Sequence, residues 1–223
     1  MKKKVRLSPS IIATDYKTDE GIEKVIELLK KSHISLVHLD VMDGKFVTNT
    51  TFGAEFVANM RDKTDFILDT HLMIENPEEQ INEYINAGAD ILTVHYEATK
   101  NLEETLKNIR DAGLLAGVSI KLETPAEELE MLVKNNLVDL VLVMSVEPGD
   151  SGRPFDERAI EKIKTLRSYS SKLDIEVDGG INPETIKRVV EAGANLVVAG
   201  SSIFRSEDPI EAIKSMKGYR CKV

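Results

Sequence analysis

Residues 87–95 read AGADILTVH and residues 192–200 read AGANLVVAG, a repeated pattern that indicates the fold class. In each segment a glycine stands between a stretch of helical periodicity and a short apolar run. Gly88 and Gly193 are therefore predicted to end a helix in the left-handed conformation, immediately before a buried strand. Because a helix, a glycine turn and a strand recur in this order, the pattern is typical of a parallel sheet.

The same alternation of strand and helix continues along the whole chain. Strands are predicted over residues 7–12, 35–40, 66–71, 90–95, 115–120, 138–143, 174–177 and 195–199. Helices are predicted over residues 18–31, 53–61, 77–86, 101–112, 125–134, 156–168, 183–191 and 209–216. Asn76-Pro77 and Asn182-Pro183 each supply a helix start signal.

Eight strands alternating with eight helices predict an α/β fold. We expect a single (β/α)8 TIM barrel with a parallel eight-stranded core, which spans residues 1–223 as one catalytic domain. An open doubly wound sheet is the competing topology.

The charge balance excludes several classes of partner. The 223 residues include 38 acidic and 29 basic side chains, a formal net charge of −9, so neither nucleic acid nor a membrane surface is an expected partner. With Cys221 as the one cysteine, no intramolecular disulfide and no Cys-based zinc site can be built. We expect neither a signal peptide nor a membrane span, and a cytoplasmic location is predicted.

Polar side chains end three of the predicted strands. Strand side chains alternate with a period of two, so His38 and Asp40 share a face, and His71 and Asp178 end two further strands. The carboxyl ends of barrel strands form one rim, where active sites lie. Imidazole and carboxylate ligands suit zinc, iron(II), manganese or cobalt, so the rim is a candidate metal site. The alternative reading is that each is an ordinary hydrogen-bonded or turn residue.

Two further acidic residues, Asp69 and Glu176, point inward one step deeper in the same strands. They either orient the ligands or belong to the polar inner layer of the barrel. His95 ends another strand, where we expect it to line the pocket without a metal role.

Glycines after the last two strands indicate phosphate binding. Gly179-Gly180 and Gly200-Ser201 are small residues at the turns where such barrels bind phosphate through backbone N–H groups. Residues 147–154, which follow the sixth strand, form a third glycine-containing loop that could close over a ligand.

In these segments the chain resembles the ribulose-phosphate 3-epimerase family. The matching segments are SPSI (8–11), HLDVMDGKFV (38–47), HLM (71–73), AGADILTVHYEA (87–98), MSVEPG (144–149), EVDGGIN (176–182) and AGSSIF (199–204). The resemblance implies a metal-dependent barrel isomerase of the pentose phosphate pathway that interconverts D-ribulose 5-phosphate and D-xylulose 5-phosphate by inverting C3. It also implies a phosphorylated ketose as partner and a possible homo-oligomer.

The resemblance also implies a role for each site residue. His38, Asp40, His71 and Asp178 correspond to the ligands of one divalent metal ion, with zinc or iron(II) first and manganese or cobalt as alternatives. Asp40 and Asp178 correspond to the catalytic acid/base pair, which acts through an enediolate. The implied substrate-binding residues are Ser10, His38, His71, Met42, Met73, Met144, Gly149, Gly152, Gly179, Gly180, Gly200 and Ser201.

The loop after the sixth strand departs from the family pattern. The family reads G-F-G-G-Q where this chain has Gly149-Asp150-Ser151-Gly152-Arg153. We expect Asp150 to point to solvent while the loop backbone faces the phosphate. Three alternatives remain: an allulose-6-phosphate 3-epimerase, a non-catalytic sugar-phosphate-binding barrel, and a metal-free barrel synthase, which gives no reason for the two histidines on the rim.

Overall fold

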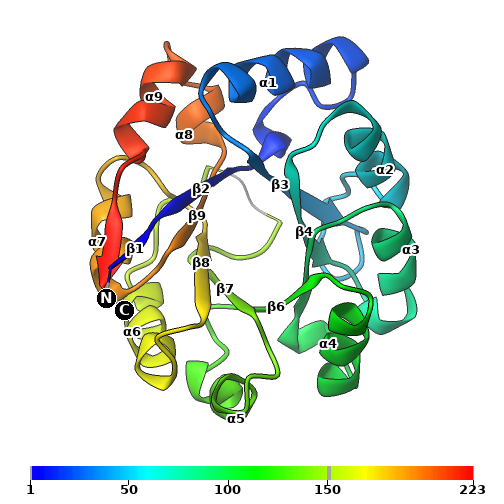
Figure 1. The fold of residues 1–223 in the computed structure, drawn as a ribbon, viewed down its shortest axis with the longest axis vertical. Helices are drawn as coiled ribbons and strands as arrows, with labels where there is room; N and C mark the ends of the chain where they lie inside the picture. The colour runs from blue at the N-terminus through cyan, green and yellow to red at the C-terminus, as the bar shows by residue number, and fades with distance from the viewer. Residues whose placement is uncertain (1, 150–151, 223) are drawn as a thin grey trace.

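The central feature of the computed structural model, which describes residues 2–149 and 152–222, is an eight-stranded parallel sheet. Its strands are β2 (Arg6–Pro9), β3 (Leu36–Met42), β4 (Ile67–Met73), β5 (Ile91–His95), β6 (Leu115–Ile120), β7 (Leu140–Met144), β8 (Asp174–Asp178) and β9 (Leu196–Ala199). They lie in the order β2-β9-β8-β7-β6-β5-β4-β3. A parallel bridge between Ser10 and His38 then joins the two edges, so the sheet curls into a barrel (Figure 1). The predicted barrel is confirmed.

The helices surround this sheet on its outside, as Figure 1 shows. They are α1 (Asp19–Lys31), α2 (Ala54–Lys63), α3 (Ile81–Asn86), α4 (Leu102–Asp111), α5 (Glu130–Lys134), α6 (Arg158–Tyr169), α7 (Thr185–Ala192), α8 (Ser201–Phe204) and α9 (Pro209–Met216). Short 3-10 helices are η1 (Ile11–Ala13), η2 (Pro77–Glu79), η3 (Tyr96–Ala98) and η4 (Ala126–Leu129). None of the described helices combines the length and the apolar character that crossing a bilayer requires.

Two predicted helices are wrong in detail. Residues 77–86 and 125–134 each begin with a 3-10 helix, η2 or η4, before the α-helix starts. Each 3-10 helix contains a hydrogen bond that spans three residues and ends on a proline carbonyl, from Gln80 N to Pro77 O (2.9 Å) in η2 and from Glu128 N to Pro125 O (3.3 Å) in η4. Such tight first turns are common where a helix begins. Helix α8 was not predicted, because four residues carry no readable period.

The two glycine turns have the predicted conformation. Gly88 has a φ of +91° and Gly193 a φ of +123°. A Cβ atom at either position would lie 2.8 Å from the Cγ atom of an arginine, Arg61 or Arg167. Both turns therefore require glycine for backbone conformation and for space.

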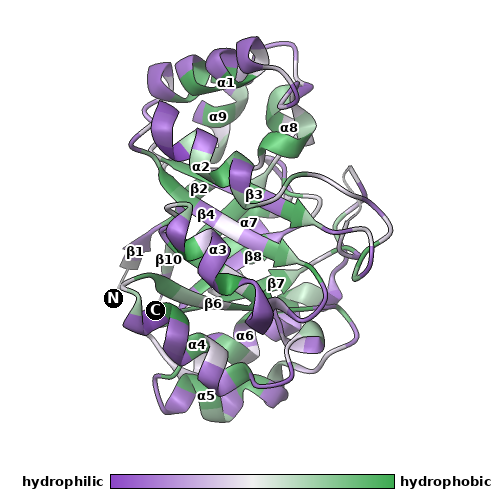
Figure 2. Ribbon diagram, turned by 90° about the vertical axis from the view of Figure 1, so that its right-hand side faces the viewer, coloured by the Kyte–Doolittle hydropathy of each residue, from purple (hydrophilic) through white to green (hydrophobic). Residues whose placement is uncertain are grey.

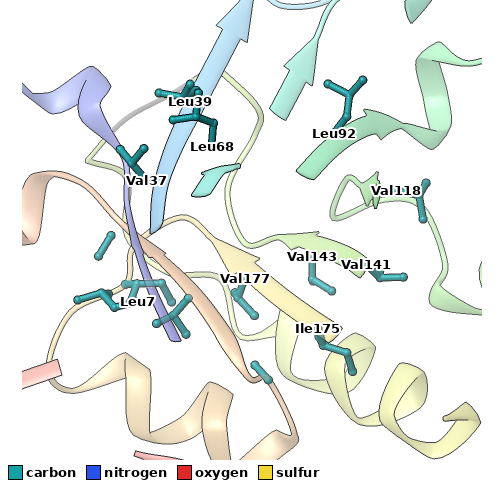
Figure 3. Packing of buried hydrophobic residues seen from close by; sticks show 14 of the residues in the cluster. Leu7, Val37, Leu39, Leu68, Leu92, Val118, Val141, Val143, Ile175 and Val177 are labelled. Carbon is teal, nitrogen blue, oxygen red and sulfur yellow. The ribbon is translucent and has the colours of Figure 1, made fainter. Parts of the chain in front are cut away.

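The apolar side chains form two layers. Outward-facing residues of the strands, such as Val37, Leu39 and Val177, pack against the helices (Figure 3). A separate inner cluster fills the barrel and consists of Leu36, Ile91, Leu140, Leu142, Met144 and Leu196. Colouring by hydropathy shows the strands as largely hydrophobic and the helices as mixed (Figure 2). Polar residues inside the barrel are therefore exceptions that need a reason.

The chain ends form a second, smaller sheet that the sequence analysis did not predict. β1 (Lys2–Lys4) pairs antiparallel with β10 (Arg220–Lys222). Lys3 Nζ and Arg6 Nη2 lie 2.9 Å and 2.7 Å from the carboxylate oxygens of Asp174 at the start of β8. Through Lys3 this sheet is tied to the amino-terminal end of β8, where Arg6 of β2 binds as well, opposite the end that carries Asp178.

Candidate active site

Four predicted metal ligands lie together at the carboxyl ends of three strands. Potential ligand atoms of His38, Asp40, His71 and Asp178 all lie within 4.8 Å of one another. The register of the sheet explains this, because Asp40 on β3 pairs with His71 on β4. Asp40 Oδ1 is 3.2 Å from both His38 Nε2 and His71 Nδ1. Two imidazole nitrogens and a carboxylate oxygen thus converge on one point.

The residues present fit a divalent cation. His38, Asp40 and His71 are buried and Asp178 is half-buried. His38 Nε2 faces Asp40 but has no hydrogen-bond partner among the described residues. A buried polar atom without a partner is costly, and a cation held between imidazole and carboxylate groups would satisfy it.

The two aspartates of the quartet differ in their proton affinity. Burial favours the protonated form of Asp40, but the neighbouring His38 and His71 outweigh burial and hold the pKa of this carboxyl well below its usual range. Burial and the charge of Asp40 raise the pKa of Asp178 to about 6. Two carboxyl groups with pKa values pushed apart, one of them near neutral pH, are suited to act as an acid and a base.

His38 is oriented from below by the inner layer of the barrel. Its Nδ1 is 2.7 Å from Asp69 Oδ2, which also accepts a 2.9 Å hydrogen bond from Ser8 Oγ. Burial opposes a charge on His38, but the carboxylates of Asp69 and Asp40 outweigh it and raise the pKa of His38. Asp69 is therefore an orienting partner, one of the two readings left open by the sequence.

Glu176 lies beside this pair, with Oε1 4.0 Å from His38 Nδ1. Burial and the nearby charge of Asp69 raise its pKa well above the ordinary value. Neither carboxyl oxygen has a hydrogen-bond partner among the described residues. Its buried position and the neighbouring Asp69 therefore favour the protonated form of Glu176, which belongs to the polar inner layer.

His71 has a partner that the sequence analysis missed. Its Nε2 is 2.9 Å from His95 Nε2, and His95 Nδ1 is 3.1 Å from Glu97 Oε2. Burial lowers the pKa of His95 to about 4, so this imidazole is neutral at pH 7. The expectation that His95 lines the pocket is wrong, because its ring lies behind His71. The HYE spacing of residues 95–97 was the available signal.

An open cavity of about 560 Å³ lies above the quartet. Asp40 and Asp178 line it, as do ten of the residues expected to bind substrate. These are Ser10, Met42, Met73, Met144, Gly149, Gly152, Gly179, Gly180, Gly200 and Ser201. His38 and His71 do not line the cavity, because they lie fully buried beneath it. Their direct contact with a substrate stays a prediction.

Gly179 and Gly180 line the cavity with backbone atoms. Gly180 has a φ of +59°, and a Cβ there would lie 2.4 Å from the backbone nitrogen of Phe155. Gly179 has a φ of +110°, and its Cβ would lie 2.7 Å from Val146. Only glycine fits both positions, and both residues line the cavity beside Asp178.

Two loops meet at the mouth of the cavity. Asn49 Nδ2, after β3, donates a 2.8 Å hydrogen bond to the carbonyl of Gly149, after β7. Gly149 has a φ of +88°, and a Cβ there would lie 3.0 Å from Val47 Cβ. The expectations for Asp150 and Ser151 fall outside the described residues.

A parallel barrel with this rim of candidate metal ligands is typical of barrel enzymes, and comparison with known proteins gives the family. The model of the ribulose-phosphate 3 epimerase family matches residues 6–204. Ribulose-phosphate 3-epimerase of Bacillus subtilis is 40% identical over 221 residues, which cover 97% of this chain and 100% of that protein. The chloroplastic ribulose-5-phosphate-3-epimerase of Arabidopsis thaliana is 42% identical over 226 residues, covering 98% and 78% of the two chains. The chain belongs to the ribulose-phosphate 3 epimerase family and is an isomerase.

Solved structures of more distant proteins share the fold alone. The structure of 3-hexulose-6-phosphate synthase from Salmonella typhimurium is similar with a TM-score of 0.68 at 19% identity. The similarity covers 95% of this chain and 96% of that one. It supports the barrel without bearing on the reaction.

Proposed function

We propose that this protein interconverts D-ribulose 5-phosphate and D-xylulose 5-phosphate by inverting C3, as the isomerase of this step in the pentose phosphate pathway. We also propose that residues 1–223 act as one catalytic domain. The observation that carries the proposal is the position of Asp40 and Asp178, which stand on different strands of one rim beside two imidazoles. A phosphorylated ketose is the proposed partner, while cytoplasmic location and homo-oligomer formation stay predictions.

His38, Asp40, His71 and Asp178 would hold one divalent cation, with zinc or iron(II) first and manganese or cobalt as alternatives. When bound, the cation would supply Lewis-acid stabilisation of negative charge on the substrate oxygens. Asp69 and His95 support the two histidine ligands from behind, which leaves Nε2 of His38 and Nδ1 of His71 directed at Asp40.

Asp40 and Asp178 would move the proton. Inversion at C3 needs removal of a proton on one face and delivery on the other, and a single base would return the proton to its original side. Asp178, with a pKa of about 6, changes its protonation state readily near neutral pH. Ser10 Oγ donates a 2.6 Å hydrogen bond to Asp40 Oδ2 and so holds that carboxylate in place.

The phosphate group would lie at the opposite side of the cavity from β4. Gly179, Gly180, Gly200 and Ser201 present backbone after β8 and β9, and Gly149 and Gly152 line the same cavity. Gly179 and Gly180 line this cavity, so their peptide groups can approach an anion closely. The three methionines Met42, Met73 and Met144 would line the space around the reacting carbons.

The test is proton NMR of D-ribulose 5-phosphate in D₂O with purified enzyme. We expect xylulose 5-phosphate to appear with deuterium at C3. Asp178→Asn and chelator-treated enzyme should each lose at least about 100-fold in rate, the usual contribution of a general acid or base. Asp65→Asn makes the same substitution at an exposed position before β4 and should retain full activity.

Two outcomes would overturn the assignment. If metal-loaded enzyme leaves the C3 proton of ribulose 5-phosphate unexchanged, the proposed reaction is wrong. If D-allulose 6-phosphate reacts with a higher kcat/KM, the protein is the related 3-epimerase instead. The altered sequence between Gly149 and Arg153 is the reason to run both substrates.

A further inference from the structure

His71, His95 and Glu97 form a linear chain of three side chains that runs outward from the rim. His95 is fully buried, and its two ring nitrogens face His71 Nε2 at 2.9 Å and Glu97 Oε2 at 3.1 Å. The ring of Phe46 covers His95 with 4.7 Å between centroids, and Lys121 Nζ lies 4.4 Å above the Phe46 ring. This cover keeps water away from the contact between the two imidazoles.

Two residues after β6 bind the other carboxyl oxygen of Glu97. Oε1 accepts a 2.8 Å hydrogen bond from Lys121 N and a further one from the Thr124 hydroxyl. Both donors need an acceptor, so the orientation of the carboxyl group is determined by the loop after β6. Oε2 is left facing His95 and, as a carboxylate oxygen, can only accept.

These contacts determine which nitrogen of each imidazole carries its proton. Glu97 Oε2 requires N–H at Nδ1 of His95, so the neutral ring of His95 has its lone pair on Nε2. That lone pair requires N–H at Nε2 of His71, so Nδ1 is the nitrogen of His71 that is left to bind a metal ion. His71 Nδ1 is the atom that lies 3.2 Å from Asp40 Oδ1.

We propose that His95 and Glu97 are positioning residues that lock His71 in the tautomer whose Nδ1 lone pair faces the metal site. The inference rests on the proposed function of His71 as a metal ligand and adds two residues that set its state. Ligating histidines commonly donate their second N–H to an oriented acceptor, and loss of that acceptor weakens metal binding about 10- to 100-fold. In this chain the acceptor is a second imidazole, so the tautomers of both rings are coupled.

Glu97→Gln tests the coupling because it reverses the direction of proton donation between Glu97, His95 and His71 while the side chain at position 97 keeps its shape. The amide oxygen stays with Lys121 N and Thr124, so the amide nitrogen faces His95 Nδ1 and donates to it. His95 must then carry its proton on Nε2, and His71 must carry its proton on Nδ1, where it blocks a metal ion. We expect the Kd for Zn²⁺, measured by competition with a chromophoric chelator, to rise about tenfold or more.

The control is Glu97→Gln in a protein whose hydrogen bonds between Glu97, His95 and His71 are already removed by a second substitution. His95→Phe keeps an aromatic ring but removes the coupling, so adding Glu97→Gln to His95→Phe should change Zn²⁺ affinity less than about twofold. If Glu97 acted only by anchoring the loop after β6, Glu97→Gln would cause the same loss of Zn²⁺ affinity in the wild type and in His95→Phe. Thermal unfolding of the metal-free variants shows whether each is folded.

The tautomers are also read directly, without metal or substrate. The chain has four histidines, so long-range ¹H–¹⁵N spectra of metal-free protein can resolve every ring. We expect His71 Nε2 to carry a proton in the wild type and to lack one in Glu97→Gln, whatever the state of Nδ1, which faces Asp40 Oδ1. A proton on His71 Nε2 in both proteins, or a full affinity loss in the His95→Phe background, would overturn the proposal.

A second pair of variants covers the case in which Glu97→Gln does not fold. His95→Gln places a carbonyl acceptor near the position of Nε2 and should keep Zn²⁺ affinity within about threefold of wild type. His95→Leu removes the acceptor and should lose about tenfold. Equal losses in the two variants would contradict a positioning role. Because none of these measurements uses a sugar phosphate, their failure is distinct from failure of the epimerase assay.

Discussion

Ser10 Oγ donates a 2.6 Å hydrogen bond to Asp40 Oδ2 at the seam where the barrel closes. The same serine forms the parallel bridge to His38 that joins the β2 and β3 edges of the sheet. Closure of the barrel and orientation of a candidate catalytic carboxylate therefore depend on one residue.

Ser10→Ala should weaken both stability and activity. The substitution leaves Asp40 Oδ2 buried without its donor, which costs about 1–3 kcal/mol of the free energy of unfolding. Urea unfolding of the metal-free protein measures this loss, and kcat/KM should fall with it. Ser215→Ala, at an exposed position on α9, is the matched control. A Ser10→Ala variant as stable and active as that control would contradict the role given to Ser10.

Gly180→Ala should raise KM for the sugar phosphate. The new Cβ would meet backbone atoms of Phe155 at 2.4 Å and 2.7 Å, so the turn beside the proposed phosphate site must shift. Gly113→Ala is the control, because Gly113 also has a positive φ (+89°) but, its chain neighbours apart, no described residue has an atom within 4 Å of the added Cβ. We expect about a tenfold rise in KM for Gly180→Ala, the equivalent of 1.4 kcal/mol of binding, and none for Gly113→Ala. Steady-state kinetics that show equal KM values for both would place the phosphate elsewhere.

Asn49→Ala should loosen the mouth of the cavity. It removes the hydrogen bond to the Gly149 carbonyl, worth about 1 kcal/mol, so KM should rise about fivefold while kcat changes less. Thr48→Ala changes the neighbouring exposed residue and should have kinetics like those of the wild type. The two loops would be shown to act independently if Asn49→Ala matched Thr48→Ala in KM.

Glu97 should make stability depend on pH below about 4.5. Burial favours protonation of Glu97, but hydrogen bonds from His95 and from two donors after β6 outweigh it and hold the pKa at about 2. An unfolded chain binds this proton near pH 4.5, so the stabilising contribution is complete above that pH and is lost as pH falls toward 2. The wild type should therefore exceed Glu97→Gln in stability at pH 7, and urea unfolding should show this difference shrinking below pH 4.5. A difference that stays constant down to pH 3 would contradict the pKa.

Local sequence patterns were sufficient to predict the barrel strands and the polar residues at their carboxyl ends. Each predicted strand overlaps an observed one, because buried parallel strands are continuous apolar runs. The period of two placed His38 and Asp40 on one face, and the parallel topology placed His71 and Asp178 on the same rim. The family resemblance added the roles that these patterns alone left open.

Other features depend on contacts that no local pattern contains. β1 and β10 have three residues each and pair across the full length of the chain, so neither shows a period of its own. The contact between His95 and His71 depends on the register of β5 against β4, in which His71 pairs with Thr93. His95 therefore stands one inward-facing position further along its strand, and its ring reaches Nε2 of His71.

By itself, the sequence determined which elements form and which side chains reach the rim, because propensity, periodicity and glycine turns act over a few residues. Only the tertiary structure decided which groups touch. Asp69 beneath His38, His95 behind His71 and Ser10 against Asp40 are set by strand register and barrel closure. The pKa values follow from the same cause, since burial and neighbouring charges, which separate Asp40 from Asp178, exist only once distant strands have come together.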